Sequence, residues 1–266
     1  MIATSRLATR FDTMRGNGRG GLVAYVTAGD PDRARSAQVL SAVARGGADV
    51  IEVGVPFSDP LADGPVIQRA TERALAAGMT LRGSLDVVRA VRKSVDTPIV
   101  LFTYANPVVR MDPAVFAKSA RDAGVDGVLL LDYPVEEAGP LRQTLVDAGL
   151  DPIFLISPTT SDERITRSAQ LGAGFLYVIS RLGVTGTRDA LADGVAPLLA
   201  RVRAHASLPV VVGFGISHPD HVAEACKHAD AAVVGSALVQ EIAAHADAPD
   251  LAARVERYVA WLKSEL

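Results

Sequence analysis

The chain is poor in the residues that mark several protein classes. Its one cysteine, Cys226, cannot form a disulfide within the chain, and no Cys/His cluster has zinc-site spacing. It has no long basic run and a formal net charge of −3, which does not suggest binding to nucleic acid or to an anionic membrane. The first 21 residues lack the apolar core of a signal peptide, and the longest apolar runs are strand-sized. We therefore expect a cytoplasmic protein without membrane-spanning helices.

What the chain does contain is a regular alternation of short apolar runs and amphipathic segments. The runs are rich in Val, Ile and Leu without a polar alternation, which indicates strands buried on both faces, as in a parallel sheet. The candidate strands are residues 21–29, 49–56, 97–104, 126–132, 151–157, 174–180, 208–214 and 230–236.

The segments between the runs have helical patterns, for example residues 31–47, 112–124, 135–149 and 193–206. Three of them end at Gly just before the next strand, in RGGADVIEV, DAGVDGVLLL and DAGLDPIFLI. A βα unit of roughly 25–35 residues thus recurs about eight times, which is typical of a (β/α)8 TIM barrel. We expect one barrel domain over residues 1–266, with an extra N-terminal helix across the bottom and a short extra helix after strand eight.

A doubly wound open sheet is the alternative fold. Against it, the first strand-to-turn segment, VTAGDP, has no G-x-G-x-x-G fingerprint for a dinucleotide.

Glycines gather after the last three candidate strands, in SRLGVTGTR, GFGIS and VVGSA. Gly186, Gly215 and Gly235 would let backbone N–H groups approach an anion, and Ser236 would add a hydroxyl at a helix N-terminus. A phosphate site at this end is a recurring feature of such barrels. Alternatively, each glycine is only a turn residue.

Two carboxylates belong to the second βα unit, IEVGVPFSDPLADGP. Alternation along the strand directs Glu52 away from its neighbours and into the barrel, where desolvation should raise its pKa and suit it to proton transfer. Asp63 is either a second catalytic group or the N-cap of the helix that follows. Asp59 has the same ambiguity, and Asp132 is either catalytic or holds a loop.

These motifs, in this order and at these strand ends, resemble the tryptophan synthase alpha chain family. VTAGDP, PFSDPLADGPVIQ, DYPVEE, SRLGVTGTR, GFGIS and VVGSA carry the resemblance, which covers nearly the whole chain. It implies retro-aldol cleavage of indole-3-glycerol phosphate to indole and glyceraldehyde 3-phosphate, without a cofactor. It also implies a β-subunit partner that carries pyridoxal phosphate, in an α2β2 assembly.

The resemblance also implies roles for individual residues. Glu52 maps on the acid/base glutamate, Asp63 on the acceptor of the indole N–H, and Tyr177 on a site tyrosine. The phosphate-binding positions map on Gly186, Gly215 and Ser236, with Phe214 beside them, and a loop threonine maps on Thr185.

An indole would need an apolar slot as well, for which the strand ends and the adjoining helix offer Tyr25, Ile67, Phe102, Leu129 and Phe214. Ordinary core packing is the alternative for these side chains. Tyr25 stands where family members often have Phe.

Other functions remain open at this level. The chain could be a lyase that works without a partner, or a barrel that only binds and activates one. Another phosphosugar isomerase or aldolase is also possible, although the sixth strand, LYVIS, has no lysine for a Schiff base.

Overall fold

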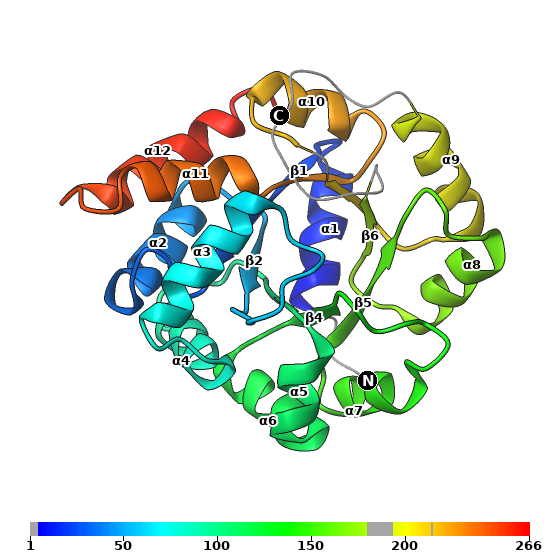
Figure 1. The fold of residues 1–266 in the computed structure, drawn as a ribbon. Helices are drawn as coiled ribbons and strands as arrows, with labels where there is room; N and C mark the ends of the chain where they lie inside the picture. The colour runs from blue at the N-terminus through cyan, green and yellow to red at the C-terminus, as the bar shows by residue number, and fades with distance from the viewer. Residues whose placement is uncertain (1–4, 180–193, 214) are drawn as a thin grey trace.

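The computed structural model describes residues 5–179, 194–213 and 215–266. Strands β1 to β8 form a closed, parallel barrel in sequential order, with helices around it (Figure 1), which confirms the predicted (β/α)8 fold. The strands are β1 Gly21–Thr27, β2 Val50–Gly54, β3 Ile99–Thr103, β4 Gly127–Leu130, β5 Asp151–Ile156, β6 Leu176–Ile179, β7 Val210–Gly213 and β8 Ala231–Val234.

The helices follow the predicted order, with a few additions between strands. They are α1 Arg6–Gly16, α2 Arg33–Arg45, α3 Pro65–Ala76, α4 Leu81–Val91, α5 Ala105–Met111, α6 Pro113–Ala123, α7 Gly139–Asp147, α8 Asp162–Leu171, α9 Val195–His205, α10 Pro219–Cys226, α11 Ser236–Ala244 and α12 Leu251–Leu262. Gly47, Gly124 and Gly149, which follow α2, α6 and α7, have positive φ values of 97°, 94° and 76°. They have the left-handed conformation expected where a helix stops before a strand.

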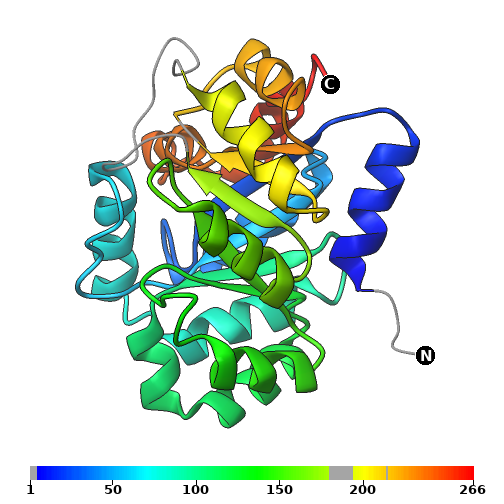
Figure 2. The same ribbon diagram turned by 90° about the vertical axis from the view of Figure 1, so that its right-hand side faces the viewer.

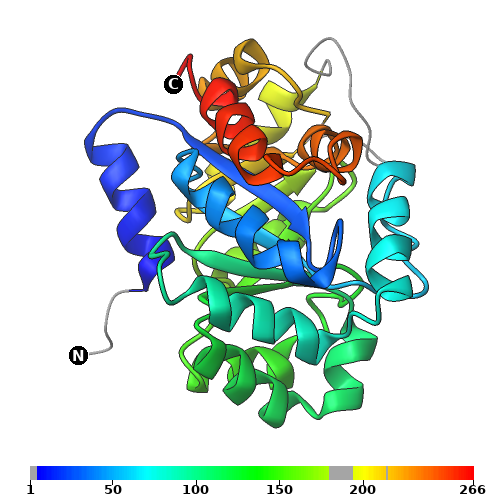
Figure 3. The same cartoon turned by 90° about the vertical axis from the view of Figure 1, so that its left-hand side faces the viewer.

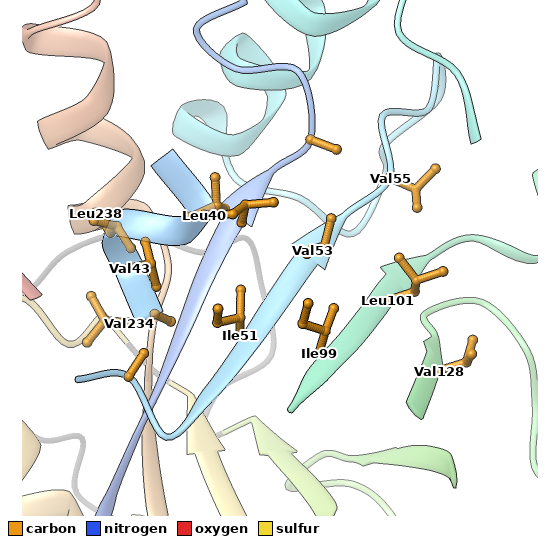
Figure 4. Packing of buried hydrophobic residues seen from close by; sticks show 14 of the residues in the cluster. Leu40, Val43, Ile51, Val53, Val55, Ile99, Leu101, Val128, Val234 and Leu238 are labelled. Carbon is orange, nitrogen blue, oxygen red and sulfur yellow. The ribbon is translucent and has the colours of Figure 1, made fainter. Parts of the chain in front are cut away.

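Side chains alternate between two cores along each strand. Ile51 and Val53 of β2 point outward and pack with Leu40 and Val43 of α2 (Figure 4). The opposite face of the strands fills the barrel, where the buried members include Val23, Val50, Val100, Leu129, Ile153, Tyr177, Val211 and Val233. Glu52 follows Ile51 and precedes Val53, so it belongs to the inward-facing set.

Helix α1 closes one end of the barrel, as the sequence predicts for the bottom. Leu7, Phe11 and Met14 are buried in the interior core, and the ring of Phe11 lies 5.6 Å from that of Phe175. The side views place α1 and α3 at opposite ends of the barrel (Figures 2 and 3). The loops that follow the strands, including the one leading to α3, therefore form the other end, which we call the mouth.

Candidate active site

Glu52 is a fully buried acid whose carboxyl has no hydrogen-bond partner in the part of the chain that the structure describes. It lies on β2 between Tyr25 of β1 and Val100 of β3 in the strand register. Its exposed fraction is 0%, and neither carboxyl oxygen has a hydrogen-bond partner among the described residues. Burial raises its pKa from the ordinary 4.5 to about 8. Such a carboxyl is protonated at neutral pH and is able to give a proton away.

Asp63 lies in the loop between β2 and α3 and is also buried. The hydroxyl of Tyr104 donates to its Oδ2 atom at 3.1 Å, and the amide of Gln68 donates to its backbone carbonyl at 2.8 Å. Burial raises the pKa of Asp63 to about 6, and the Tyr104 hydrogen bond opposes that rise. The N-cap alternative is wrong: α3 is capped by Gly64, without a side-chain cap hydrogen bond. The Asp63 side chain is thus available for chemistry.

Tyr104 is a site residue that the sequence reasoning did not single out. Its hydroxyl accepts a hydrogen bond from the Ala62 backbone N–H at 3.1 Å as well as donating to Asp63, and its ring lies 5.0 Å from that of Phe57. These contacts fix the β2–α3 loop against the end of β3. The only indication in the sequence is a tyrosine directly after a strand, where barrel chemistry gathers.

Two further tyrosines, Tyr25 and Tyr177, lie over glycines of neighbouring strands. A Cβ atom on Gly54 would lie 2.0 Å from the Tyr25 hydroxyl, and one on Gly213 would lie 2.7 Å from the Tyr177 hydroxyl, so both rings cover a glycine. Burial raises the pKa of each phenol well above its ordinary value, and the charges of Glu52 and Asp63 both add to the rise. Both acids therefore act on the same two phenols.

Three of the residues predicted to form the apolar slot, Tyr25, Ile67 and Phe102, pack in one cluster. Phe102 meets Tyr25 edge to face, with 5.3 Å between ring centroids and 79° between planes, and Ile67 of α3 packs in the same cluster. Leu129 is fully buried in the barrel interior, as core packing would also require. Phe214 and Thr185 lie outside the described residues.

The predicted phosphate-binding residues follow neighbouring strands. Gly215 comes after β7 with a φ of +48°, and Gly235 directly follows β8, which pairs with β7. Gly235 is the N-cap of α11, so Ser236 is the first residue of that helix, where backbone N–H groups are free to bind an anion. Gly186 lies outside the described residues.

The two ambiguous aspartates have local partners. Asp132 accepts a hydrogen bond from the Ala105 backbone N–H at 2.7 Å, at the start of α5. It therefore holds the loops after β4 and β3 together, which is the structural role the sequence left open. Asp59 is exposed and accepts a 2.5 Å hydrogen bond from the hydroxyl of Ser58.

Metal-binding clusters and membrane-spanning helices are both absent from the described ranges. No group of three or more His, Cys, Asp or Glu side chains there is arranged to hold a metal ion. Within those ranges, no helix has both the length and the apolar composition required to cross a membrane.

The sequence profile of the family described as tryptophan synthase alpha chain matches residues 11–265. The chain belongs to this family. The tryptophan synthase alpha chain of Solibacter usitatus is 47% identical over 259 residues, 97% of each chain. That of Burkholderia thailandensis is 46% identical over 263 residues, 98% of this chain and 97% of the relative.

Solved structures of tryptophan synthase agree with this assignment. The subunit alpha from Legionella pneumophila superposes with a TM-score of 0.89 at 36% identity, covering 99% of this chain and 98% of that one. A tryptophan synthase chain from Mycobacterium tuberculosis gives 0.90 at 35% identity, with 98% of each chain covered. A tryptophan synthase alpha chain is a carbon–carbon lyase of tryptophan biosynthesis that cleaves indole-3-glycerol phosphate. It works with a β subunit, and pyridoxal phosphate belongs to that subunit.

Proposed function

We propose that this tryptophan synthase alpha chain cleaves indole-3-glycerol phosphate by proton transfer at Glu52, with Asp63 stabilising the charge that forms on the indole ring. The observation that carries the proposal is the buried carboxyl of Glu52, which has no hydrogen-bond partner among the described residues and whose pKa is raised to about 8. A pKa close to the working pH suits a group that must both give and take a proton.

In this mechanism, Glu52 begins as the neutral acid and gives its proton to C3 of the indole. The ring then carries a positive charge at its nitrogen and accepts the electron pair of the breaking bond between C3 and the glycerol carbon. The hydroxyl on that carbon loses its proton to the Glu52 carboxylate and becomes the aldehyde. The products are indole and glyceraldehyde 3-phosphate, and Glu52 is neutral again.

Asp63 has the opposite role to Glu52, because the mechanism also needs a carboxylate that stays ionised. With a pKa of about 6, it is mostly negative at pH 7, while Glu52 is mostly protonated. A negative group accepting the indole N–H stabilises the cationic ring, an effect that is strong in a site with little water. Tyr177, whose phenol feels the charge of Glu52 most strongly after the effect of burial, contacts the substrate beside it.

The phosphate and the indole ring of the substrate bind to two different groups of residues. The phosphate binds at Gly186, Gly215, Gly235 and Ser236, through backbone N–H groups and one hydroxyl. The indole lies among the apolar residues Tyr25, Ile67, Phe102, Leu129 and Phe214, and Thr185 is a further residue of the site.

The β subunit binds at the mouth, over the loop FSDPLAD and the segment YANPVV, most of which forms the start of α5. Each of these segments carries an exposed apolar side chain: Leu61 is 88% exposed and Val109 is 57% exposed. Apolar side chains in the open are expected where a partner covers them. We place the assembly, α2β2, in the cytoplasm.

The test is the release of indole from indole-3-glycerol phosphate, measured with and without a tryptophan synthase β subunit. We expect slow turnover alone and faster turnover in the complex. High turnover without a partner would instead indicate a stand-alone lyase. No turnover in either condition, with activation of the β subunit retained, would indicate a barrel that only activates its partner.

A further inference from the structure

Helix α3 carries two polar side chains that the proposed chemistry does not use, Gln68 in its first turn and Arg73 in its last. Both are partly buried, and both form hydrogen bonds to residues outside the helix. The helix begins directly after Asp63 and Gly64 and contributes Ile67 to the indole slot. Its position therefore affects both the second acid and the substrate pocket.

Gln68 ties the backbone of Asp63 to the helix. Its backbone N–H donates to the Gly64 carbonyl at 2.9 Å, and its side-chain amide donates to the Asp63 carbonyl at 2.8 Å. On the other side, the Asp63 N–H donates to the Pro60 carbonyl at 3.0 Å. The two peptide groups that follow Asp63 are thus bound to α3, so the direction of the Asp63 carboxylate depends on where the helix lies.

Arg73 ties the other end of the helix to the residues after β1. Its Nε atom donates to Oδ1 of Asp30 at 2.8 Å, and its Nη2 atom donates to Oδ2 at 3.0 Å. Asp30 follows β1 in VTAGDP, and its side chain is fully buried, whereas that of Arg73 is 36% exposed. Two parallel hydrogen bonds between a guanidinium and a carboxylate fix direction as well as distance. The pair therefore restrains α3 relative to β1.

The packed face of α3 supplies little restraint of this kind. Two of its buried residues are alanines, Ala70 and Ala74. The cluster that this face forms joins α3 to β1 and α11, and its members are Tyr25, Ile67, Ala70 and Val239. Burial of apolar surface stabilises without fixing direction. The ion pair in the last turn of the helix therefore adds a directional contact that the packing lacks.

We propose that Gln68 and Arg73 are positioning residues, through which α3 holds the Asp63 carboxylate where it accepts the indole N–H. Arg73 anchors the helix to Asp30, and Gln68 transmits the position of the helix to the Asp63 backbone. Neither residue contacts the substrate or transfers a proton. The inference rests on the proposed function, in which Asp63 stabilises the cationic ring, and adds the groups that set the geometry of that acid.

The test begins with Gln68→Met and Arg73→Lys. Methionine keeps the length and helix preference of glutamine but removes the donor, and lysine keeps the charge beside Asp30 but loses the two-pronged contact. In each variant kcat should fall roughly three- to tenfold, because a misplaced Asp63 stabilises the transition state less well. The affinity for glyceraldehyde 3-phosphate, measured by calorimetry, should stay unchanged, since the phosphate-binding positions follow other strands.

The decisive measurement repeats both substitutions in Asp63→Asn. Residues that act through the Asp63 carboxylate lose their effect once it is gone, so kcat of each double variant should equal that of Asp63→Asn alone. A general structural role would instead lower kcat by the same factor in both backgrounds.

Two matched substitutions serve as controls. Arg69→Lys changes an exposed arginine of the same helix. Gln143→Met changes a glutamine of α7 whose amide donates to Asp147 at 2.7 Å on the surface. Both should leave kcat unchanged in either background.

The outcomes separate this inference from the function on which it rests. An unchanged kcat in the folded single variants would overturn the inference, and so would an equal fall with and without the Asp63 carboxylate. If Arg73→Lys does not fold, Gln68→Met alone decides. The proposed role of Asp63 fails on a different result, near-normal turnover of Asp63→Asn itself, and the inference then fails with it.

Discussion

The two ends of the barrel use buried carboxylates in opposite ways. At the bottom, three aspartates accept a backbone N–H from a neighbouring strand and pair with one or more cations. They are Asp49 with Lys263, Asp126 with Arg92 and Arg6, and Asp230 with Arg15 and Arg203. At the mouth, Glu52 has no partner among the described residues, and Asp63 is held by a phenol.

The difference shows in proton affinity. Burial would raise the pKa of Asp230, but hydrogen bonds and the nearby arginines outweigh it and lower that pKa. Burial alone raises the pKa of Glu52 to about 8. Asp230 at the bottom is therefore held in its charged form, whereas Glu52 is able to change charge. A paired carboxylate is suited to holding strands together, and an unpaired one to moving protons.

Asp151 shows that a buried acid with one carboxyl oxygen unpartnered among the described residues does not by itself define a site. It begins β5 at the bottom end, its Oδ2 atom has no partner among the described residues, and burial raises its pKa. Among the described residues, the charges acting on Asp151 are those of Asp126 and Arg121, and no phenol is among them, whereas the phenols of Tyr25 and Tyr177 both respond to Glu52 and Asp63. Catalysis therefore requires a buried acid together with other polar groups that act on it, and not the buried acid alone.

The largest expected effect at the mouth is that of Glu52→Gln. Turnover should fall by about 10³–10⁴-fold, because shape is kept and proton transfer is lost. Stability should change in the opposite direction. The folded-state pKa of about 8 exceeds the ordinary 4.5, so the acid's contribution to stability decreases between these pH values. Removing it should raise the free energy of unfolding by about 2–3 kcal/mol at pH 7, and by much less at pH 5.

Steady-state turnover and urea unfolding at both pH values check this prediction. Near-normal turnover would remove Glu52 from the chemistry. Equal stability of the two proteins at pH 7 would mean that its carboxyl is better solvated than its burial indicates.

The counterpart at the bottom is Asp126→Asn. Asp126 accepts from the Ile99 N–H at 2.8 Å and from Arg92 at 2.7 Å, and the Arg92 side chain is only 12% exposed. Breaking a buried pair leaves a charge without its partner, so the free energy of unfolding should fall by about 3 kcal/mol. Turnover per folded molecule should stay unchanged. A loss of turnover in folded protein would contradict the division between the two ends.

Asp63→Asn should have an effect between these two. We expect turnover to fall by about 10²-fold, since the amide cannot stabilise the cationic ring. The acid limb of the pH profile should also disappear, because activity rises as Asp63 ionises through a pKa of about 6. Kinetics and thermal melting are measured together. A change in melting temperature with unaltered kinetics would assign Asp63 to the structure of the loop.

The sequence predicts the strands and the direction of Glu52 better than it predicts the contacts between side chains at either end of the barrel. All eight strands and the inward direction of Glu52 follow from hydrophobic patterns that repeat locally. The link between Tyr104 and Asp63 does not, because it joins residues 41 apart across two strand ends. Nor could the local sequence decide between catalysis and capping for Asp63, since Asp-Gly-Pro suits both. The pair of Arg6 and Asp126 spans 120 residues and leaves no local pattern.

The smallest predicted effects are those of two serine substitutions, one at each end of the barrel. Ser236 begins α11 at the mouth, so Ser236→Ala should weaken phosphate binding by only about 1–2 kcal/mol, because the backbone donors remain. Ser5 caps α1 at the bottom by accepting from the Ala8 N–H at 3.1 Å, so Ser5→Ala should cost about 1 kcal/mol of stability and no affinity. Calorimetry with glyceraldehyde 3-phosphate measures the affinity of each variant, and thermal melting measures its stability. Complete loss of binding in Ser236→Ala would show that the hydroxyl, rather than the backbone, holds the anion.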